Sequence, residues 1–217
     1  MAHPKTVFEG IVLAAGLSSR MKDWKPEIKI KDIPVIVRAV KPMIEHCEKV
    51  IVVGGFNFEK LHRMINEENY FTEQQLKKIV LAENKNYAMG MFASVKSGLQ
   101  MIGNNAGVFI MPGDIPFVKS STYSSLIKIY NTENNFDVFI PAAKVEPENS
   151  VANDMLRRGH PILIKSKLIN EILSYPDDKN LRDVLEDFTR KFVQVNDKGI
   201  FIDIDDKNDL EKAKKIF

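Results

Sequence analysis

The chain has 217 residues, 44% of them hydrophobic, and its 31 lysine and arginine residues nearly balance 29 aspartate and glutamate residues. This composition suits one α/β-sized domain over residues 1–217, and the near-neutral charge argues against a nucleic-acid partner. A single cysteine excludes an internal disulfide framework, and no apolar run is long enough to span a bilayer. We therefore expect a cytoplasmic protein that has no membrane association.

Two kinds of apolar segment alternate along the chain. Short apolar runs predict strands at residues 7–14, 50–53, 78–81, 107–111, 137–140, 160–164, 192–195 and 200–204. Amphipathic spacing predicts helices at residues 34–46, 58–67, 91–101, 120–131, 167–174, 180–188 and 207–216. This order predicts a single-domain α/β fold, a Rossmann-like three-layer sandwich with a mostly parallel sheet and helices on both faces. Residues 142–158 are polar and irregular, which predicts a long surface loop over a site.

The first predicted strand ends in small and hydroxyl residues followed by an arginine. Residues 13–21 read Leu-Ala-Ala-Gly-Leu-Ser-Ser-Arg-Met. Small residues let the backbone approach a ligand, successive N–H groups can hold an anion, and an arginine donates to phosphate oxygens. The segment is equally compatible with an ordinary strand-to-helix turn and with a nucleoside triphosphate site that includes Arg20 and Lys25. Spacing alone does not distinguish Lys25 from the three other lysines between residues 22 and 31.

A carboxylate follows the predicted strand at residues 107–111. Asp114 stands between Gly113 and Pro116, and an acid in this place suits Mg²⁺, which takes one or two carboxylates together with phosphate oxygens. Taken alone, Asp114 is better explained as a turn residue that caps a helix. Beside the loop at residues 13–21, a metal ligand becomes the preferred interpretation.

Carboxylates also alternate where the predicted strand at residues 200–204 ends. Period-two spacing places Asp203 and Asp205 on one face of that strand. Either residue could join Asp114 on a metal ion, and Asp205 is the preferred second ligand. Asp206 could be only the N-cap of the helix that follows.

Two more glycine-containing segments precede predicted elements. Residues 89–99 read Met-Gly-Met-Phe-Ala-Ser-Val-Lys-Ser-Gly-Leu, and a helix that begins there would attract an anion or a base carbonyl, although a plain amphipathic helix is equally consistent. Residues 157–161 read Arg-Arg-Gly-His-Pro, and two arginines suit an anionic substrate. We favour a positioning role for His160 over general-base catalysis, since a phosphate nucleophile is largely dianionic at neutral pH.

Together these segments resemble the nucleotidyltransferases of the molybdopterin guanylyl/cytidylyltransferase type. The family pattern Leu-Ala-Ala-Gly-x-Ser-x-Arg-Met, with a lysine after it, matches residues 13–25, and the metal motif Gly-Asp-x-Pro matches residues 113–116. The cytidylyltransferase branch adds Gly-Met-x-x-Ser-x-x-x-Gly-Leu, Gly-His-Pro and Asp-Ile-Asp-x-x-x-Asp-Leu. These three elements match residues 90–99, 159–161 and 203–210.

Two features favour one branch, and two others depart from the family pattern. Ala15 stands where guanylyl members tend to have glycine, and those members usually lack Gly-His-Pro, so the resemblance implies CTP rather than GTP. Lys22 stands where the family usually has glycine. The family element Gly-Asp-x-Gly-x-Arg corresponds to residues 177–182, which contain neither glycine.

The resemblance implies transfer of CMP from CTP to the terminal phosphate of a molybdopterin-type molybdenum cofactor, with Mg²⁺ as cofactor and pyrophosphate as product. It implies that Arg20, Lys25 and Asp114 are catalytic and that Asp114 and Asp205 hold the metal. It implies a nucleotide site of Leu13, Ala14, Ala15, Gly16, Ser18, Ser19, Asn84, Gly90, Met91, Ser94 and Gly113. It implies an acceptor site of Arg158, Gly159, His160, Pro161 and Arg182. A molybdoenzyme or its maturation chaperone would then be the protein partner.

Two alternatives remain open at this point. A cytidylyl- or uridylyltransferase for another small phosphate, such as a sugar or polyol phosphate, would not need the large cleft that a pterin requires near Gly159 and His160. A non-catalytic carrier would bind a nucleotide or cofactor without releasing pyrophosphate. The intact set of carboxylates and basic residues argues against the carrier.

Overall fold

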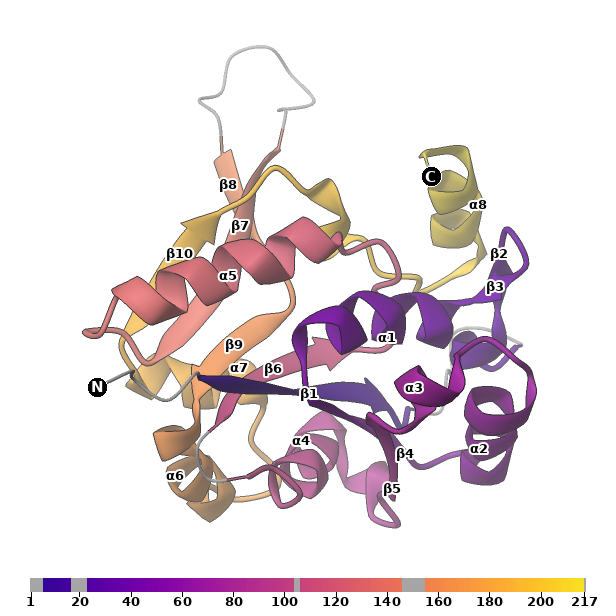
Figure 1. Ribbon diagram of the computed structural model, residues 1–217, viewed down its shortest axis with the longest axis horizontal. Coiled ribbons are helices and arrows are strands. Elements are labelled where there is room, and N and C mark those ends of the chain that lie inside the picture. The colour runs from indigo at the N-terminus through magenta and orange to yellow at the C-terminus, as the bar shows by residue number, and fades with distance from the viewer. Residues whose placement is uncertain (1–5, 17–22, 104–105, 146–154, 217) are drawn as a thin grey trace.

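The computed structural model describes residues 6–16, 23–103, 106–145 and 155–216 (Figure 1). Within these ranges, an eight-stranded sheet has the order β10-β7-β9-β6-β1-β4-β5, and β8 pairs with β7. Its strands are β1 (Val7–Ala14), β4 (Lys49–Gly54), β5 (Ile79–Glu83), β6 (Ala106–Pro112), β7 (Val138–Val145), β8 (Met155–Arg158), β9 (Ile162–Lys165) and β10 (Arg190–Gln194). A separate hairpin joins β2 (Lys29–Ile30) to β3 (Ile33–Pro34).

The centre of the sheet is parallel and apolar on both faces. β1 pairs in parallel with β4 and β6, and β4 pairs in parallel with β5. Five of the six residues of β4 are buried, as expected for a strand that helices cover on both sides. β10 is parallel to β7, whereas β9 is antiparallel to both β6 and β7. The sheet is therefore mostly parallel, as predicted.

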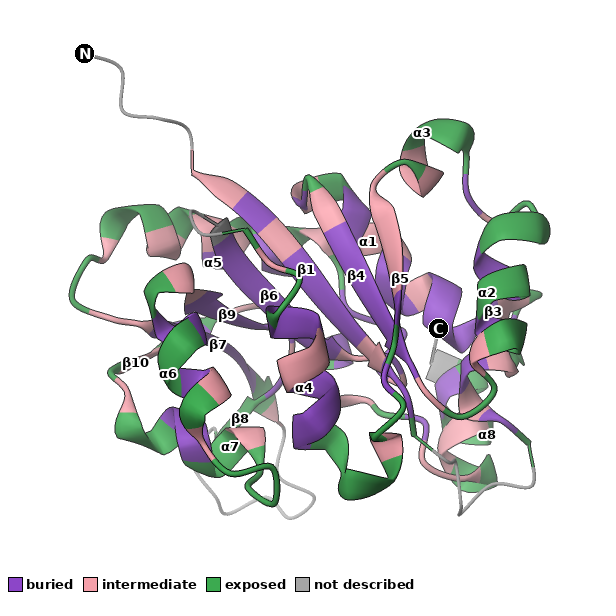
Figure 2. Cartoon of the chain, turned by 90° about the horizontal axis from the view of Figure 1, so that it is seen from below, coloured by how far each residue is buried: buried purple, intermediate pink, exposed green. Residues whose placement is uncertain are grey.

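Helices lie on both faces of the sheet (Figures 1 and 2). The helices of one face are α1 (Val35–His46), α2 (Phe58–Glu67) and α5 (Ser120–Thr132), and their apolar side chains form the first core with the sheet. The helices of the other face are α4 (Met91–Leu99), α6 (Ile169–Ser174) and α7 (Leu181–Val184), which form the second core. This arrangement confirms the predicted single-domain, three-layer α/β fold.

The other helical segments are short or lie near the end of the chain. They are α3 (Glu73–Leu76), α8 (Lys207–Ile216), and the 3₁₀ helices η1 (Lys25–Glu27), η2 (Tyr87–Met89), η3 (Ser166–Leu168), η4 (Leu185–Asp187) and η5 (Lys198–Phe201). A capping box between Thr72 and Gln75 stabilises α3, which apolar spacing did not predict. No helix in the described part of the chain combines the length and the apolar character needed to cross a membrane.

The strand predicted at residues 200–204 was wrong. This segment is η5 followed by irregular chain. It makes isolated backbone hydrogen bonds instead of a strand ladder: the N–H of Ile204, for example, donates to the carbonyl of Asp114 at 2.9 Å. The buried carboxylate of Asp197 accepts the N–H of Gly199 at 2.9 Å and so stabilises the turn.

The prediction of a surface loop at residues 142–158 was wrong at both ends of that segment, which are strands. β7 continues to Val145 and pairs antiparallel with β8, so that Ala142 lies opposite Arg158. Every residue of β8 is exposed, and Figure 1 shows this two-stranded ribbon projecting from one end of the sheet. A strand such as β8, which is exposed at every residue, needs no apolar alternation, which is the signal by which a strand is predicted. Residues 146–154 lie outside the described residues.

Candidate functional site

A pocket opens where β1 and β6 end, the edge at which a parallel sheet is expected to bind a ligand. Its volume is ≈ 390 Å³. Leu13 of β1 pairs with Pro112 of β6, so the loops that follow the two strands begin side by side. The pocket is lined by Leu13, Ala14, Ala15, Gly16, Lys25, Pro26, Tyr87, Ala88, Gly90, Met91, Ser94, Pro112, Gly113 and Asp114.

Predicted site residues from distant parts of the chain meet in this pocket. Residues 13–16 line it from the end of β1, Gly90 and Met91 line it from the start of α4, and Asp114 lines it from the loop after β6. Lys25 contributes from η1. Three other predicted residues, Ser18, Ser19 and Arg20, lie outside the described residues.

The loop after β6 packs tightly against β1. The N–H of Gly113 donates to the carbonyl of Leu13 at 2.8 Å. A Cβ at Gly113 would lie 2.9 Å from that carbonyl oxygen and 2.8 Å from Cδ1 of Ile36. Contacts this short leave no room for a side chain, so glycine is required here. This close approach places the next residue, Asp114, at the pocket.

The loop that leads into α4 is fixed by a buried amide. The Nδ2 of Asn84 donates to Oγ of Ser94 at 2.9 Å, and its Oδ1 accepts the N–H of Asn86 at 2.9 Å. Asn84 is 4% exposed and is absent from the residues that line the pocket. It was predicted to bind nucleotide, and in the structure it bonds the loop and Ser94, which itself lines the pocket.

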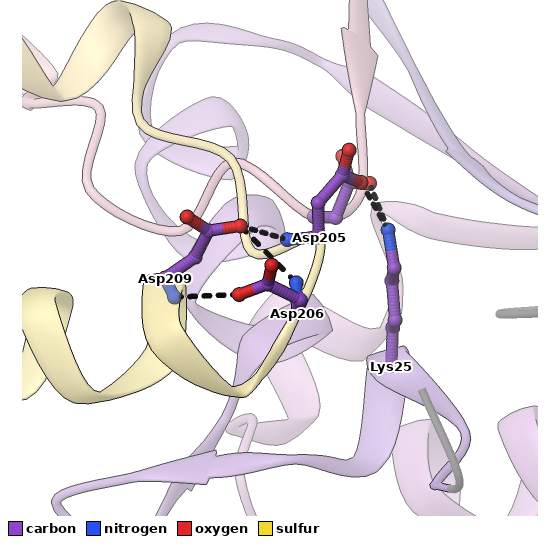
Figure 3. Close-up of polar contacts among 5 residues, drawn as sticks. Lys25, Asp205, Asp206 and Asp209 are labelled. Carbon is purple, nitrogen blue, oxygen red and sulfur yellow. Dashed lines mark hydrogen bonds and ion pairs between the residues drawn. The ribbon is translucent and has the colours of Figure 1, made fainter. Parts of the chain in front are cut away.

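Lys25 contacts two carboxylates that are distant in sequence (Figure 3). Its Nζ lies 3.2 Å from Oδ2 of Asp114 and 2.5 Å from Oδ1 of Asp205. The lysine side chain is only 13% exposed, and each carboxylate side chain is 28% exposed. Across the described residues, no group of three or more His, Cys, Asp or Glu side chains is placed to hold a metal ion. Asp114 and Asp205 form an acidic pair that shares the ammonium group of Lys25.

These neighbouring charges alter one another's pKa. Burial raises the pKa of Asp114 above its ordinary value; Lys25 opposes this rise, while Asp203 and Asp205 add to it. Burial lowers the pKa of Lys25, but its hydrogen bonds and charge attraction to Asp205 and Asp114 outweigh burial, so the pKa of Lys25 is raised. The raised pKa of Lys25 shows that the two carboxylates favour a positive charge beside them.

Asp205, rather than Asp203, meets Asp114 across the lysine. Ile204, which stands between the two candidate aspartates, is 0% exposed and belongs to a small core that includes residues of β2 and α1. Its N–H donates to the carbonyl of Asp114 at 2.9 Å. The side chains before and after Ile204 thus differ in surroundings: Asp205 contacts Lys25, whereas Asp203 is exposed.

The predicted acceptor segment packs against the chain near η5. The N–H of Gly159 donates to the carbonyl of Pro141 at 2.9 Å, and the N–H of His160 donates to the carbonyl of Ile200 at 2.8 Å. A Cβ at Gly159 would lie 2.2 Å from the oxygen of Ile200, so only glycine fits. Burial lowers the pKa of His160 to about 4, and its imidazole is therefore neutral at neutral pH.

Antiparallel pairing of β9 with β6 brings this segment to the same edge of the sheet as Asp114. Ile162 of β9 pairs with Ile110 of β6, and the buried Pro161 directly precedes β9. The chain before β9 therefore lies beyond the carboxyl end of β6. The described pocket nevertheless includes none of the predicted acceptor residues, which are Arg158, Gly159, His160, Pro161 and Arg182.

The two adjacent arginines of β8 lie on opposite faces of the sheet. The guanidinium of Arg158 is 5.0 Å from the ring centre of Phe192, which lies in β10 on the face covered by α4, α6 and α7. The guanidinium of Arg157 is 4.7 Å from the ring centre of Phe201, on the face of α1 and α5. α7 carries the exposed Arg182 and covers the same face as Arg158. The two predicted acceptor arginines therefore belong to one side of the molecule.

Four of the pocket residues were not predicted, and they are Pro26, Tyr87, Ala88 and Pro112. Tyr87 lies in η2 and packs closely on Gly55, where an added Cβ would be 2.6 Å from the Cβ of Tyr87. Pro26 lies in the first turn of η1, beside Lys25. Position relative to β5 is the signal that could have identified Tyr87, because residues that follow a parallel strand lie at the ligand-binding edge.

Comparisons with known proteins agree with this geometry. Residues 10–194 match the family described as the MobA-like NTP transferase domain. The chain is 27% identical over 206 residues to the molybdenum cofactor cytidylyltransferase of Escherichia coli (strain K12), and the alignment covers 94% of each protein. It is 23% identical over 206 residues to the probable molybdenum cofactor guanylyltransferase of Natranaerobius thermophilus, again over 94% of each. The crystal structure of Rv0371c from Mycobacterium tuberculosis in complex with manganese has a TM-score of 0.70 and 18% identity, covering 98% of this chain and 100% of that one.

The family match extends from β1 to the end of β10. It includes the loop after β1, the start of α4 and Asp114, which line the pocket. The likeness to the mycobacterial structure supports the fold alone, because the two chains are only 18% identical. The chain therefore belongs to the MobA-like NTP transferase family and is, by enzyme class, a nucleotidyltransferase.

Proposed function

We propose that this nucleotidyltransferase transfers CMP from CTP to the terminal phosphate of a molybdopterin-type molybdenum cofactor and releases pyrophosphate. The observation that carries the proposal is the shared pocket, where residues 13–16 and the start of α4 face Lys25 and Asp114. The cytidylyltransferase of Escherichia coli aligns over nearly the whole of both chains, which supports both this donor and this acceptor.

The triphosphate would lie at the loop after β1 and the base at the start of α4. Ala14 and Ala15 are small and 5% exposed, so this wall offers mainly backbone to a ligand, and successive N–H groups suit phosphate oxygens. Gly90 has φ +113°, and a Cβ there would meet nothing within 4 Å. The start of α4 thus leaves open space for a base, whose carbonyl the helix N–H groups can bind. Ala15, where guanylyl relatives tend to have glycine, supports cytosine.

Displacement at the α-phosphorus would depend on charge neutralisation and positioning. The protonated Lys25 is the described cation in this pocket that would neutralise charge on the transferring group. Arg20 is assigned the same task from the family pattern alone. The acceptor phosphate is largely dianionic at neutral pH and can attack without a base. The neutral His160 would therefore help to position the acceptor.

Mg²⁺ is the cofactor that we propose, and the donor set suits it. The carboxylates of Asp114 and Asp205 share one ammonium group, and burial keeps the pKa of Asp114 raised despite that contact. The two carboxylates thus lie close together, and hard carboxylate oxygens are the ligands that Mg²⁺ prefers. Bound there, the ion would supply neutralisation of the triphosphate charge. The manganese complex of the mycobacterial protein supports a divalent cation in this fold.

The acceptor would approach from the side of the β7–β8 ribbon. Gly159 and His160 reach the sheet edge that carries Asp114, and Arg158 lies on the same face as α4. This side is open enough for a large acceptor such as a pterin, because every residue of β8 is exposed. An exposed arginine can donate two parallel hydrogen bonds to a phosphate.

The test is pyrophosphate release with molybdenum-loaded molybdopterin and each of the four NTPs in turn. We expect turnover with CTP to exceed turnover with GTP, ATP and UTP. Equal turnover with GTP would overturn the choice of nucleotide. A parallel series with sugar and polyol phosphates tests the acceptor, and faster pyrophosphate release with one of these would assign the enzyme to that small phosphate instead.

A further inference from the structure

One carboxylate of α8 binds the backbone of the residue that contacts Lys25 (Figure 3). The Oδ2 of Asp209 accepts the N–H of Asp205 at 3.1 Å and the N–H of Asp206 at 3.1 Å. Asp206 in turn accepts the N–H groups of Asn208 at 2.7 Å and Asp209 at 2.9 Å through its Oδ1. Asp206 is therefore the N-cap of α8, the role that its sequence position suggested.

The bond to Asp205 goes beyond what the helix needs. In a capping box, the side chain at the third helical position bonds only the N–H of the N-cap residue. Asp209 meets that requirement through Asp206 and also bonds the N–H of Asp205, which lies before the helix begins. The additional bond from the Asp205 N–H connects α8 to the acidic pair and does not contribute to the helix itself.

Three contacts together determine where the Asp205 carboxylate lies. Its side chain contacts Lys25 at 2.5 Å, and its own N–H is held by Asp209. The residue before it, Ile204, is fully buried and bonded to the carbonyl of Asp114. Fixing the backbone on both sides of Asp205 restricts where its carboxylate can reach, and the contact with Lys25 holds it there. An ionised acceptor makes the bond from the Asp205 N–H a charge-assisted one.

We propose that Asp209 is a positioning residue that orients Asp205 for a divalent cation in the pocket. This inference rests on the proposed function, because it assumes that Asp114 and Asp205 hold a metal ion. Partners that orient metal ligands typically change metal affinity about 10-fold or more when they are removed. α8 then belongs to the active centre, although its helical residues do not line the described pocket.

The matched pair Asp209→Ala and Asp206→Ala separates positioning from helix capping. Both variants remove carboxylate oxygens that accept N–H groups at the same helix end, but only Asp209→Ala removes the bond from Asp205. Free Mn²⁺, measured by electron paramagnetic resonance without nucleotide because the triphosphate itself binds Mn²⁺, reports the affinity. We expect Asp209→Ala to weaken Mn²⁺ binding about 10-fold relative to Asp206→Ala, at a similar loss of thermal midpoint. Asp209→Asn keeps an oxygen that can accept the bond and should restore most of the affinity.

Two outcomes would overturn the inference alone. If Asp209→Ala and Asp206→Ala bind Mn²⁺ equally, Asp209 only caps the helix. If Asp209→Asn binds Mn²⁺ as weakly as Asp209→Ala does, the negative charge of Asp209 acts on the ion directly instead of through the hydrogen bond to Asp205. Asp114→Ala is the separate check on the proposed function: unchanged Mn²⁺ affinity in that variant would overturn the metal assignment itself, and the inference with it.

Discussion

The two sides of this site are anchored in different ways. The nucleotide side, made of residues 13–16, 90–94 and 113–114, continues directly from central strands and from a buried helix. The acceptor side, made of residues 158–161 and 182, depends on a projecting ribbon and a short surface helix. Val12 and Met111, which precede the nucleotide loops, are both 0% exposed, whereas all four residues of β8 are exposed. Core packing thus fixes the loops of the nucleotide side, whereas most of the acceptor side lies outside the core.

This difference explains why the family pattern is kept unevenly. A loop that follows a buried parallel strand cannot change without changing the core, since interiors are closely packed. The nucleotide side retains its motifs except at Lys22, and most of their described residues line one pocket. On the acceptor side, the element at residues 177–182 has lost both family glycines. Change is tolerated where residues meet solvent, and substrate preference can change there while the reaction stays the same.

The largest expected effect comes from the nucleotide side. Asp114→Ala removes the pocket carboxylate that contacts Lys25, and losing one preorganised charge of this kind typically lowers kcat by about 10²–10³-fold. Asp205→Ala should fall in the same range. Asp203→Ala is the comparison, because Asp203 is exposed and should lose far less. Pyrophosphate release at saturating CTP measures all three, and an Asp203 variant as impaired as the Asp114 variant would contradict this assignment of the acidic pair.

A smaller effect is expected at His160 on the acceptor side, and it concerns the free energy of unfolding. Burial lowers the pKa of His160 to about 4, below the 6.5 expected in the unfolded chain. As the pH falls below 6.5, His160 becomes protonated in the unfolded state. In the folded state it stays neutral until about pH 4. The free energy of unfolding should therefore decrease across this window, by at most about 3 kcal/mol from His160.

Urea unfolding at a series of pH values measures this effect. His160→Gln removes the titrating group and should flatten the decrease between pH 6.5 and about 4. His62→Gln provides the control, because it replaces a histidine that lies exposed on α2. Identical profiles for the His160 variant and the wild type would mean that the imidazole is not buried in solution.

The same contrast shows how far the sequence could predict the structure. Buried strands and the loops that follow them were predictable, because apolar runs and small residues are constrained at every position. The pairing of β7 with β8 was not, since the exposed strand β8 carries no apolar alternation. The role of Asn84 was also hidden: a polar residue that bonds Ser94 has the same sequence signature as one that contacts ligand. Tyr87 was missed although it follows β5 at the ligand-binding edge, whereas its close packing on Gly55 is a long-range contact that local sequence pattern does not contain.

The smallest expected effect would locate the acceptor on one face of the ribbon. Arg158 and Arg157 are neighbours of equal charge and similar exposure, yet they lie on opposite faces. If the acceptor phosphate binds on the face of α4 and α7, Arg158→Ala should raise the KM for the acceptor about tenfold, the cost of one charged hydrogen bond, and leave the KM for CTP unchanged. Arg157→Ala should change neither constant, because its guanidinium lies over Phe201 on the other face. A larger rise in the acceptor KM for Arg157→Ala would place the acceptor beside η5 instead. The nucleotide side and the acceptor side would then meet across the C-terminal segment and not across the sheet edge.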